Sequence, residues 1–276
     1  GNYMDKLVVH IGGGDPVFGN SDDPIRFAVS KLAHLHCCAA QEHAQNLRNI
    51  GEEDFRIQWT GNAAYVNIDK TEKIQLEDLS KLLDLPISEG NYLVLIQHPL
   101  SSEVDESYKQ MEITLHSLKE FYSKHGYQVV CIAPNSDPGS YLIRKLIKEY
   151  HSNPWFHSVQ TLPRLHFVNL MRHAKVLVGN SSMGIVEAPY YKLPVVNLGN
   201  RQKGRINAGN VEFVTQEKVS IIKALENACF DLSYRKHVRK LSNPYGDGSA
   251  ARKILEAIEN VDLDDSRWYV KRKLCP

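Results

Sequence analysis

The chain of 276 residues lacks the features that mark several large classes of protein. Its formal net charge is only +1 and no basic stripe dominates it, which argues against a nucleic-acid binder. No apolar run approaches membrane-spanning length, and the N-terminus has no signal-peptide pattern. We therefore expect no nucleic-acid partner and no membrane partner, and a cytoplasmic location.

Cysteine is scarce and follows no pattern. The five cysteines are odd in number and lack metal-ligand spacing, which fits a reducing compartment. Twelve histidines invite a metal hypothesis, but no His-x-x-x-His pair with a nearby acid occurs. The Gly12-Gly13-Gly14 turn does not complete a dinucleotide fingerprint, so a close backbone turn is the simpler interpretation. We expect no metal ion and no cofactor.

The chain does contain a long alternation of predicted strands and helices, with no internal repeat. Such alternation predicts an α/β fold of Rossmann type, with doubly wound parallel sheets. We expect a partial N-terminal domain over 1–67, a C-terminal domain over 68–245, and a crossover helix and tail over 246–276. Polar residues near 67–76 mark the junction. The tail from 263 onward, including Lys271-Arg272-Lys273, is expected to be loosely held and solvated.

Individual elements follow from apolar periodicity and from capping residues. The expected strands are 7–11, 35–39, 55–60, 92–96, 128–132, 176–178 and 194–198. The expected helices include 22–34, a helix from Gln41, 103–124, 138–150, 165–173, 183–191, 216–230 and 249–258.

The run from Val176 to Glu187 is the most informative stretch. A short apolar strand breaks at Gly-Asn-Ser-Ser into an apparent helix start, so that Ser181, Ser182 and free backbone N–H groups could bind phosphate. Glu187 is placed to accept hydrogen bonds from a sugar hydroxyl. The alternative for this motif alone is an ordinary capped helix after a core strand.

Three other predicted strands also end in polar clusters. These clusters are Gln97-His98-Pro99, the segment 134–140, and the basic loop 199–205. In an open parallel sheet, ligands bind in the crevice at the carboxyl ends of the strands. The four clusters together favour an anionic, nucleotide-linked ligand.

Seven blocks in this order resemble the hydrolysing UDP-N-acetylglucosamine 2-epimerases, and most closely the epimerase part of the bifunctional epimerase/kinase of sialic-acid synthesis. The resemblance covers residues 10 to about 255. The blocks are 10–14, 21–26, 97–99, 134–140, 179–187, 197–205 and 245–248.

The resemblance implies a GT-B-like fold whose C-terminal domain binds UDP or a UDP-sugar. Carried over by position, Ser181 and Ser182 would bind the diphosphate and Glu187 the ribose hydroxyls. His98 would lie against the diphosphate and support the departure of UDP. The remaining binding candidates are Arg201 for phosphate charge, Phe167 beside the uracil, Asn135 and Gly61.

The family reaction is expected to proceed by loss of the C2 proton with elimination of UDP, followed by addition of water. It needs a carboxylate base and an acid. Asp22 matches a family catalytic acid, although a helix-start acid serving the macrodipole explains it equally well. Gly12 stands where the family has a glutamate, and Asp15 is the candidate to replace it.

The family also has βα units, including a Gly-Asp-Arg block, that precede the strand at 7–11. We therefore expect the first sheet to be incomplete, with an open edge and an uncovered apolar face. Either the chain is a fragment, or it associates as a homo-oligomer or with a partner that supplies the missing segment. We expect little epimerase activity from the chain alone. A non-catalytic UDP-sugar binding or regulatory protein and a GT-B glycosyltransferase remain alternatives.

Overall fold

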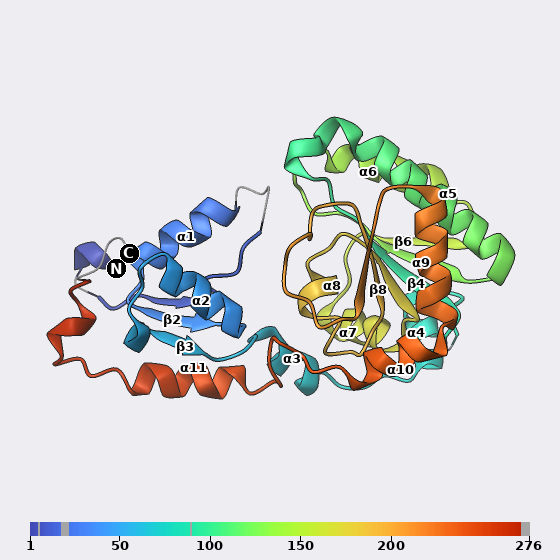
Figure 1. Cartoon of the computed structure of the whole chain (residues 1–276). Coiled ribbons are helices and arrows are strands. Elements are labelled where there is room, and N and C mark those ends of the chain that lie inside the picture. The colour runs from blue at the N-terminus through green and yellow to red at the C-terminus, as the bar shows by residue number, and fades with distance from the viewer. Residues whose placement is uncertain (5, 18–21, 89, 272–276) are drawn as a thin grey trace. The chain divides into compact units, whose positions relative to one another are not determined.

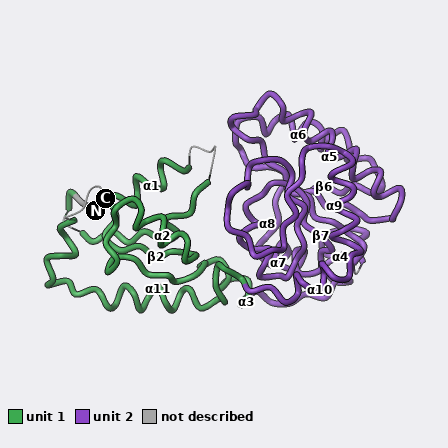
Figure 2. Tube along the Cα trace, in the orientation of Figure 1, with its two compact units in different colours: residues 1–70, 243–276 green, residues 71–242 purple. Residues whose placement is uncertain are grey.

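The computed structural model describes residues 1–276 except 5, 18–21, 89 and 272–276. Ser21 of the second sequence block and Arg272 and Lys273 of the tail lie outside the described residues. The chain divides into two compact units, shown in green and purple in Figure 2. Unit 1 combines residues 1–70 with 243–276, and unit 2 is the continuous segment 71–242.

Unit 1 is built on a small parallel sheet. Its three strands are β1 (Val9–Ile11), β2 (Leu35–Cys38) and β3 (Ile57–Trp59), in the order β1-β2-β3. Its helices are α1 (Asp22–Leu32), α2 (Gln41–Asn49), α3 (Ala64–Lys70) and α11 (Ala250–Glu259), with 3-10 turns at Asn2–Met4, Asp54–Arg56 and Ser266–Trp268.

The expectation of an uncovered apolar face on this sheet is wrong. Leu35 and Cys37 of β2 pack against Ile254 of α11 and against Trp268 in one buried cluster. Cys38 packs into a second cluster with residues of α2. Residues more than 200 positions away in sequence therefore cover the face, which local patterns around 7–60 do not reveal.

The expectation of a loosely held, solvated tail is also wrong as far as Lys271. Arg56, which is fully buried, donates to the carbonyl oxygens of Trp268 (3.1 Å) and Val270 (3.2 Å) and to that of Arg267. Lys271 Nζ lies 2.6 Å from Glu52 Oε2. The tail is held because a buried guanidinium and a buried carboxylate both require partners, and the tail supplies them.

Glu52 is the centre of this buried polar cluster. Its side chain is fully buried and lies 3.0 Å from Lys31 Nζ and 3.0 Å from His36 Nε2, in addition to Lys271. Burial alone would raise the pKa of Glu52, but hydrogen bonds from His36, Lys271 and Lys31 outweigh burial and hold the pKa at about 2. The carboxylate is therefore ionised at neutral pH.

Unit 2 is built on a six-stranded parallel sheet in the order β6-β5-β4-β7-β8-β9. The strands are β4 (Tyr92–Ile96), β5 (Gln128–Ile132), β6 (Phe156–Val159), β7 (Val176–Gly179), β8 (Val195–Leu198) and β9 (Val211–Val214). This is the Rossmann order, in which the direction of winding reverses between the first and fourth strands, here β4 and β7. The predicted α/β class with doubly wound parallel sheets is confirmed.

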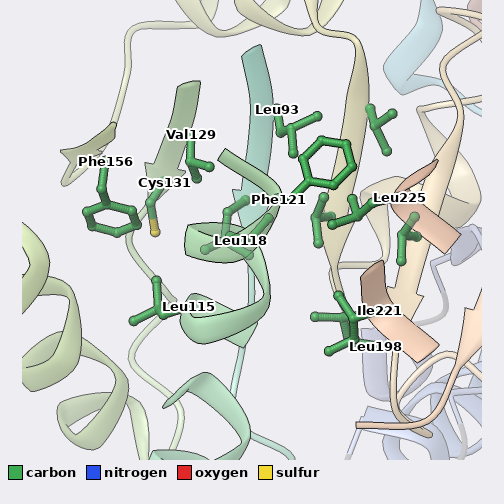
Figure 3. Close-up of a cluster of buried hydrophobic side chains, with 14 of the residues drawn as sticks. Leu93, Leu115, Leu118, Phe121, Val129, Cys131, Phe156, Leu198, Ile221 and Leu225 are labelled. Atoms are coloured by element: carbon green, nitrogen blue, oxygen red, sulfur yellow. The ribbon is translucent and has the colours of Figure 1, made fainter. Parts of the chain in front are cut away.

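Helices cover both faces of this sheet (Figure 1). One core cluster joins the strands to α5 (Ser107–His125), α6 (Ser140–Tyr150) and α9 (Lys218–Phe230); Figure 3 shows Leu115, Leu118 and Phe121 of α5 beside Leu93 and Val129. The other cluster joins the opposite face to α4 (Leu76–Leu83) and α7 (Arg164–His173). The two remaining helices are α8 (Met183–Val186) and α10 (Leu232–Lys240).

Two predicted helices differ from the structure. The helix expected over 103–124 begins as a 3-10 turn at Ser101–Glu106, where Glu103 has non-helical dihedral angles, and continues as α5. The helix expected over 183–191 is a single turn, α8, followed by turns. Pro189 lies in those turns, and the residue before a proline is disfavoured in helical conformation.

Candidate functional site

The carboxyl ends of β4 and β7 are joined by one amide side chain at the point where the winding of the sheet reverses. Asn180 Oδ1 accepts from the His98 backbone N–H (2.7 Å), and Asn180 Nδ2 donates to the His98 carbonyl (2.8 Å). Gly179 precedes Asn180 with φ +126°, and a Cβ there would collide with the Ile96 carbonyl. Only glycine permits this approach, so the Gly-Asn pair fixes His98 relative to the residues that follow β7.

His98 is held as a neutral imidazole. Its Nδ1 accepts from the Asn135 backbone N–H at 3.2 Å, so the proton of the neutral ring lies on Nε2. Burial and, to a smaller extent, the Arg201 cation lower the pKa of His98 to about 4, although Asp137 and the hydrogen bond from Asn135 oppose the shift. Near neutral pH the ring therefore offers an uncharged N–H donor.

The loop after β8 adds positive charge at the same place. Arg201 Nη1 and the fully buried Gln202 Nε2 both donate to the Asn180 carbonyl, each at 3.1 Å. Arg205 in turn donates to Gln202 Oε1 at 2.8 Å. His98, Asn180 and Arg201 are thus linked across three strand ends by hydrogen bonds to one asparagine.

The segment after β7 offers donors to an anion. Ser182 is exposed, and Ser181 Oγ accepts from the Met183 N–H at 3.4 Å. Within the described part of the chain, the backbone N–H groups of Ser181 and Ser182 donate to no acceptor. Two hydroxyls and two available N–H groups at one turn suit a phosphate better than a neutral ligand.

Glu187 lies at the end of α8 and is only partly exposed. Burial raises its pKa, and the Arg164 cation opposes that shift. Its Oε2 is buried and accepts no hydrogen bond from any described residue. A desolvated carboxylate oxygen of this kind favours hydroxyl donors such as those of a diol. Phe167, on the same helix as Arg164, is partly buried against the second core cluster.

Unit 1 carries a separate pocket of about 310 Å³ at the carboxyl ends of its strands. Asp15 and Gly61 both line this pocket, together with Gly12. The carboxylate of Asp15 lies 3.1 Å from Arg26 Nη1 and 3.4 Å from His43 Nε2, so it is held between two basic side chains. Asp22 is the exposed first residue of α1 and does not line the pocket.

The backbone conformation and the close packing at position 61 require glycine. Its φ is +87°, and a Cβ there would lie 3.2 Å from the Tyr245 carbonyl. The next residue, Asn62, donates its N–H to the same carbonyl at 2.8 Å. The block at 245–248 therefore supports the rim of the unit 1 pocket, and Gly61 serves close packing there.

The structure thus gathers the predicted residues into two groups. His98, Asn135, Arg201, Ser181, Ser182 and Glu187 follow strands or the short α8 of unit 2, and Asp15 and Gly61 share the unit 1 pocket. Prediction from sequence missed Asn180, a buried amide directly after β7, and Gln202, a buried amide in the loop after β8. It also missed His10 and Arg26 as pocket residues. No group of three or more possible metal ligands occurs among the described residues.

A Rossmann-ordered sheet whose winding reversal carries hydroxyls, a neutral histidine and a basic loop defines the chain as an α/β protein of the nucleotide-binding type of fold. A family model described as UDP-N-acetylglucosamine 2-epimerase matches residues 1–259, and the chain belongs to that family. The resemblance read from the seven sequence blocks is confirmed.

Two curated relatives are similar to the chain over most of its length. It is 31% identical over 261 residues to the UDP-N,N'-diacetylbacillosamine 2-epimerase (hydrolyzing) of Legionella pneumophila, covering 95% of this chain and 66% of the relative. It is 31% identical over 209 residues to the GDP/UDP-N,N'-diacetylbacillosamine 2-epimerase (hydrolyzing) of Campylobacter jejuni, covering 74% of this chain and 53% of the relative. The chain thus spans between about half and two thirds of these relatives.

Solved structures agree on the fold. The UDP-GlcNAc 2-epimerase of Neisseria meningitidis, crystallised with UDP-GlcNAc, matches 94% of this chain and 71% of its own with a TM-score of 0.78 and 21% identity. The GT-B-like fold class is confirmed by this likeness. Among the described residues, no helix is both long enough and apolar enough to cross a membrane.

Proposed function

We propose that unit 2 binds UDP or a UDP-linked amino sugar, and that the chain acts in a hydrolysing UDP-N-acetylglucosamine 2-epimerase reaction. The observation that carries the proposal is the junction at the winding reversal, where Asn180 links His98 to Arg201. Family membership supports the reaction class, and the relatives named above act on UDP-linked sugars.

In this proposal the diphosphate lies against the loop after β7. Ser181 and Ser182 donate hydroxyl and backbone N–H groups to phosphate oxygens, and Arg201 neutralises part of the charge. Glu187 accepts from the ribose diol, and Phe167 borders the uracil. Asn135 acts by holding His98, since its N–H occupies Nδ1 and leaves Nε2–H free to donate.

The reaction converts UDP-N-acetylglucosamine and water into UDP and N-acetylmannosamine. A base removes the C2 proton while the bond between C1 and the phosphate oxygen breaks, and UDP departs with that electron pair. Water then adds across the resulting double bond, placing hydroxyl on C1 and hydrogen on the opposite face of C2. The neutral His98 donates a hydrogen bond to the departing diphosphate, where negative charge develops.

The base is proposed to be a carboxylate of unit 1. Asp15 is the stronger candidate because it lines a pocket and is held between Arg26 and His43. Asp22 is exposed at the start of α1, which suits its alternative role at the helix N-terminus. Gly12, at φ +84°, is a poor position at which to restore the family glutamate.

Calorimetric titration with UDP tests the binding part of the proposal. Loss of one charge-assisted contact costs about 1.5–3 kcal/mol, so Ser182→Ala and Glu187→Ala should each weaken UDP binding about tenfold or more. Ser123→Ala and Glu149→Ala remove the same groups from exposed positions on α5 and α6 and should leave affinity unchanged. Equal affinity in all five proteins would refute the placement of UDP.

Incubation with UDP-N-acetylglucosamine tests the chemistry. Release of UDP with free N-acetylmannosamine supports the epimerase, and transfer of sugar to an acceptor supports the glycosyltransferase alternative. UDP binding without turnover supports the non-catalytic alternative and agrees with the expectation of little activity from this chain alone. Parallel assays with UDP-N,N'-diacetylbacillosamine test the sugar named for two relatives.

The proposal extends to the protein's surroundings. A role in sialic-acid or related nonulosonic-acid synthesis and association as a homo-oligomer, or with a partner that adds βα units to unit 1, remain predictions. β1 and β3 each pair only with β2 among the described strands, which supports the association. The four described cysteines carry free thiols, which supports a reducing, cytoplasmic location.

A further inference from the structure

His10 lines the unit 1 pocket beside Asp15 and Arg26, and the proposed function gives it no part. It is the central residue of β1 and pairs in register with His36 of β2. The two imidazole rings meet edge to face, with their centroids 6.4 Å apart. His36 is itself held by Glu52, whose Oε2 lies 3.0 Å from His36 Nε2. The ring of His10 therefore rests on a fixed neighbour.

A fully buried serine determines where the proton of His10 lies. Ser30 Oγ, on α1, donates its proton to the Arg26 carbonyl one turn earlier, at 3.1 Å. A hydroxyl has only one proton to donate, so Ser30 Oγ must accept in its second hydrogen bond, which is with His10 Nδ1 at 3.0 Å. Nδ1 therefore carries the proton, and Nε2 of the neutral ring carries a lone pair.

The surroundings of His10 keep this ring uncharged. Burial lowers the pKa of His10 below its ordinary value of 6.5, and the nearby His36 and Arg26 lower it further. Near neutral pH, Nε2 is thus a hydrogen-bond acceptor, and no described residue donates to it. His98 has the opposite tautomer, because its Nδ1 accepts from Asn135 and its Nε2–H donates.

Gly13 leaves room for the contact between His10 and Ser30. A Cβ at position 13 would lie 2.8 Å from His10 Nδ1 and 3.2 Å from Ser30 Oγ. The backbone of Gly13 does not have a positive φ, unlike that of Gly12 and Gly14. The glycine is therefore needed for space and not for backbone conformation, and a larger residue would push the ring away from the serine.

We propose that His10 is a substrate-binding residue whose Nε2 accepts a hydrogen bond from a hydroxyl of the sugar, and that Ser30 is the positioning residue that fixes the accepting tautomer. This inference rests on the proposed function, in which the substrate is a UDP-linked sugar and unit 1 supplies groups to it. A hydroxyl suits the pocket because it can donate to His10 and accept from a donor such as Arg26. An uncharged acceptor also binds a hydroxyl without adding negative charge beside Asp15.

Nuclear magnetic resonance of nitrogen-15-labelled protein tests the tautomer. Correlations between the ring protons and ring nitrogens distinguish a protonated Nδ1 from a protonated Nε2, and the signals missing from His10→Gln assign the residue. The wild type should show an unprotonated Nε2, and Ser30→Ala should show a mixture of tautomers. A protonated Nε2 in the neutral wild-type ring would overturn the inference.

Calorimetric titration with UDP and with UDP-N-acetylglucosamine tests the contact. His10→Phe keeps a ring but removes the acceptor, so affinity for UDP-N-acetylglucosamine should fall about three- to tenfold while affinity for UDP stays unchanged. Gly13→Ala should act in the same direction by displacing the ring. His10→Gln keeps an acceptor and should retain more of the affinity than His10→Phe. The control His116→Phe, at an exposed position on α5, should bind both ligands as the wild type does.

The two ligands separate failure of this inference from failure of the proposed function. Absence of UDP binding in the wild type would refute the proposed function and, with it, this inference. Normal UDP binding with equal affinity for UDP-N-acetylglucosamine in the wild type and His10→Phe would overturn the inference alone. Equal weakening of both ligands in His10→Phe would show a purely structural role and would also overturn it. Thermal melts identify any variant that does not fold, and Gly13→Ala then supplies the comparison in place of His10→Phe.

Discussion

Asn180 provides the sharpest test of how the unit 2 site is assembled. Replacing it with alanine removes both hydrogen bonds to the His98 backbone, of 2.7 and 2.8 Å, in a place where the asparagine is 5% exposed. Each bond contributes about 0.5–1.5 kcal/mol net, and more where a buried group is left unpaired. We therefore expect Asn180→Ala to lower the free energy of unfolding by about 2–4 kcal/mol.

The same change should weaken UDP binding. His98 loses its fixed position relative to the loop after β7, so UDP affinity should fall about tenfold or more, as for loss of a direct phosphate contact. The assays are urea unfolding followed by circular dichroism and calorimetric titration with UDP, both applied to protein that remains folded.

Asn210 offers a matched control. It is also a fully buried asparagine, and its Nδ2 donates to the carbonyls of Leu193 (3.1 Å) and Gly184 (3.4 Å). It precedes β9, at the amino edge of the sheet. Asn210→Ala should cost comparable stability and leave UDP affinity unchanged. Wild-type UDP affinity in Asn180→Ala, or equal losses in the two variants, would refute the positioning role.

Three further predictions concern protonation, buried charge and backbone strain. The folded-state pKa of His98 is about 4, below its ordinary value, so the unfolded chain binds the proton first as pH falls. The free energy of unfolding should therefore fall by up to about 3 kcal/mol as pH drops from about 6.5 to 4. In urea unfolding across this range, the free energy should depend less steeply on pH for His98→Gln, and an unchanged dependence would contradict the buried neutral ring. Glu52→Gln removes the carboxylate that Lys31 and Lys271 contact, and should lower the free energy of unfolding in urea by about 3–5 kcal/mol. The control Asp54→Asn breaks an exposed ion pair and should lower it by under about 1 kcal/mol. Similar losses of stability in the two variants would refute the role of Glu52. In Gly61→Ala, at φ +87°, the added Cβ would press on the Tyr245 carbonyl. The melting temperature should therefore fall more than in Gly126→Ala, at φ +75°, where nothing lies within 4 Å of the added Cβ. Equal shifts in melting temperature would show that the close approach at Gly61 is unimportant.

The sequence was most informative where strands are buried on both faces. The central strands β4, β5, β7 and β8 were predicted within one residue because their apolar runs are continuous. The two edge strands of the unit 2 sheet, β6 and β9, were missed. Both mix polar and apolar side chains, as in Phe156-His157-Ser158-Val159, because an edge strand is less enclosed and its pattern is correspondingly weaker.

The site was predicted in part for a related reason. Residues such as Ser181 and Arg201 follow strands with continuous apolar runs, so the ends of those strands could be located from sequence. The residue types then indicated which ligand groups these side chains could bind. The side chains of Asn180 and Gln202 form hydrogen bonds with backbone groups of other segments. A local sequence pattern does not reveal such partners. The contacts of Arg56 and Glu52 with the tail join residues more than 200 positions apart, which explains why the tail was predicted to be loose.

The division of unit 1 into two stretches of sequence has a consequence for the order in which the protein is made. Unit 2 is one continuous segment, whereas β2 and Arg56 obtain their final partners only from residues 250–271. During synthesis the second unit can therefore complete its core while the first, although translated earlier, still waits for its last helix. Until residues 250–271 have left the ribosome, Glu52 lacks one of its cations, and Leu35 and Cys37 of β2 lack their packing against α11. Arrest of translation or proteolysis in this late segment would thus damage unit 1, most of which is made before unit 2.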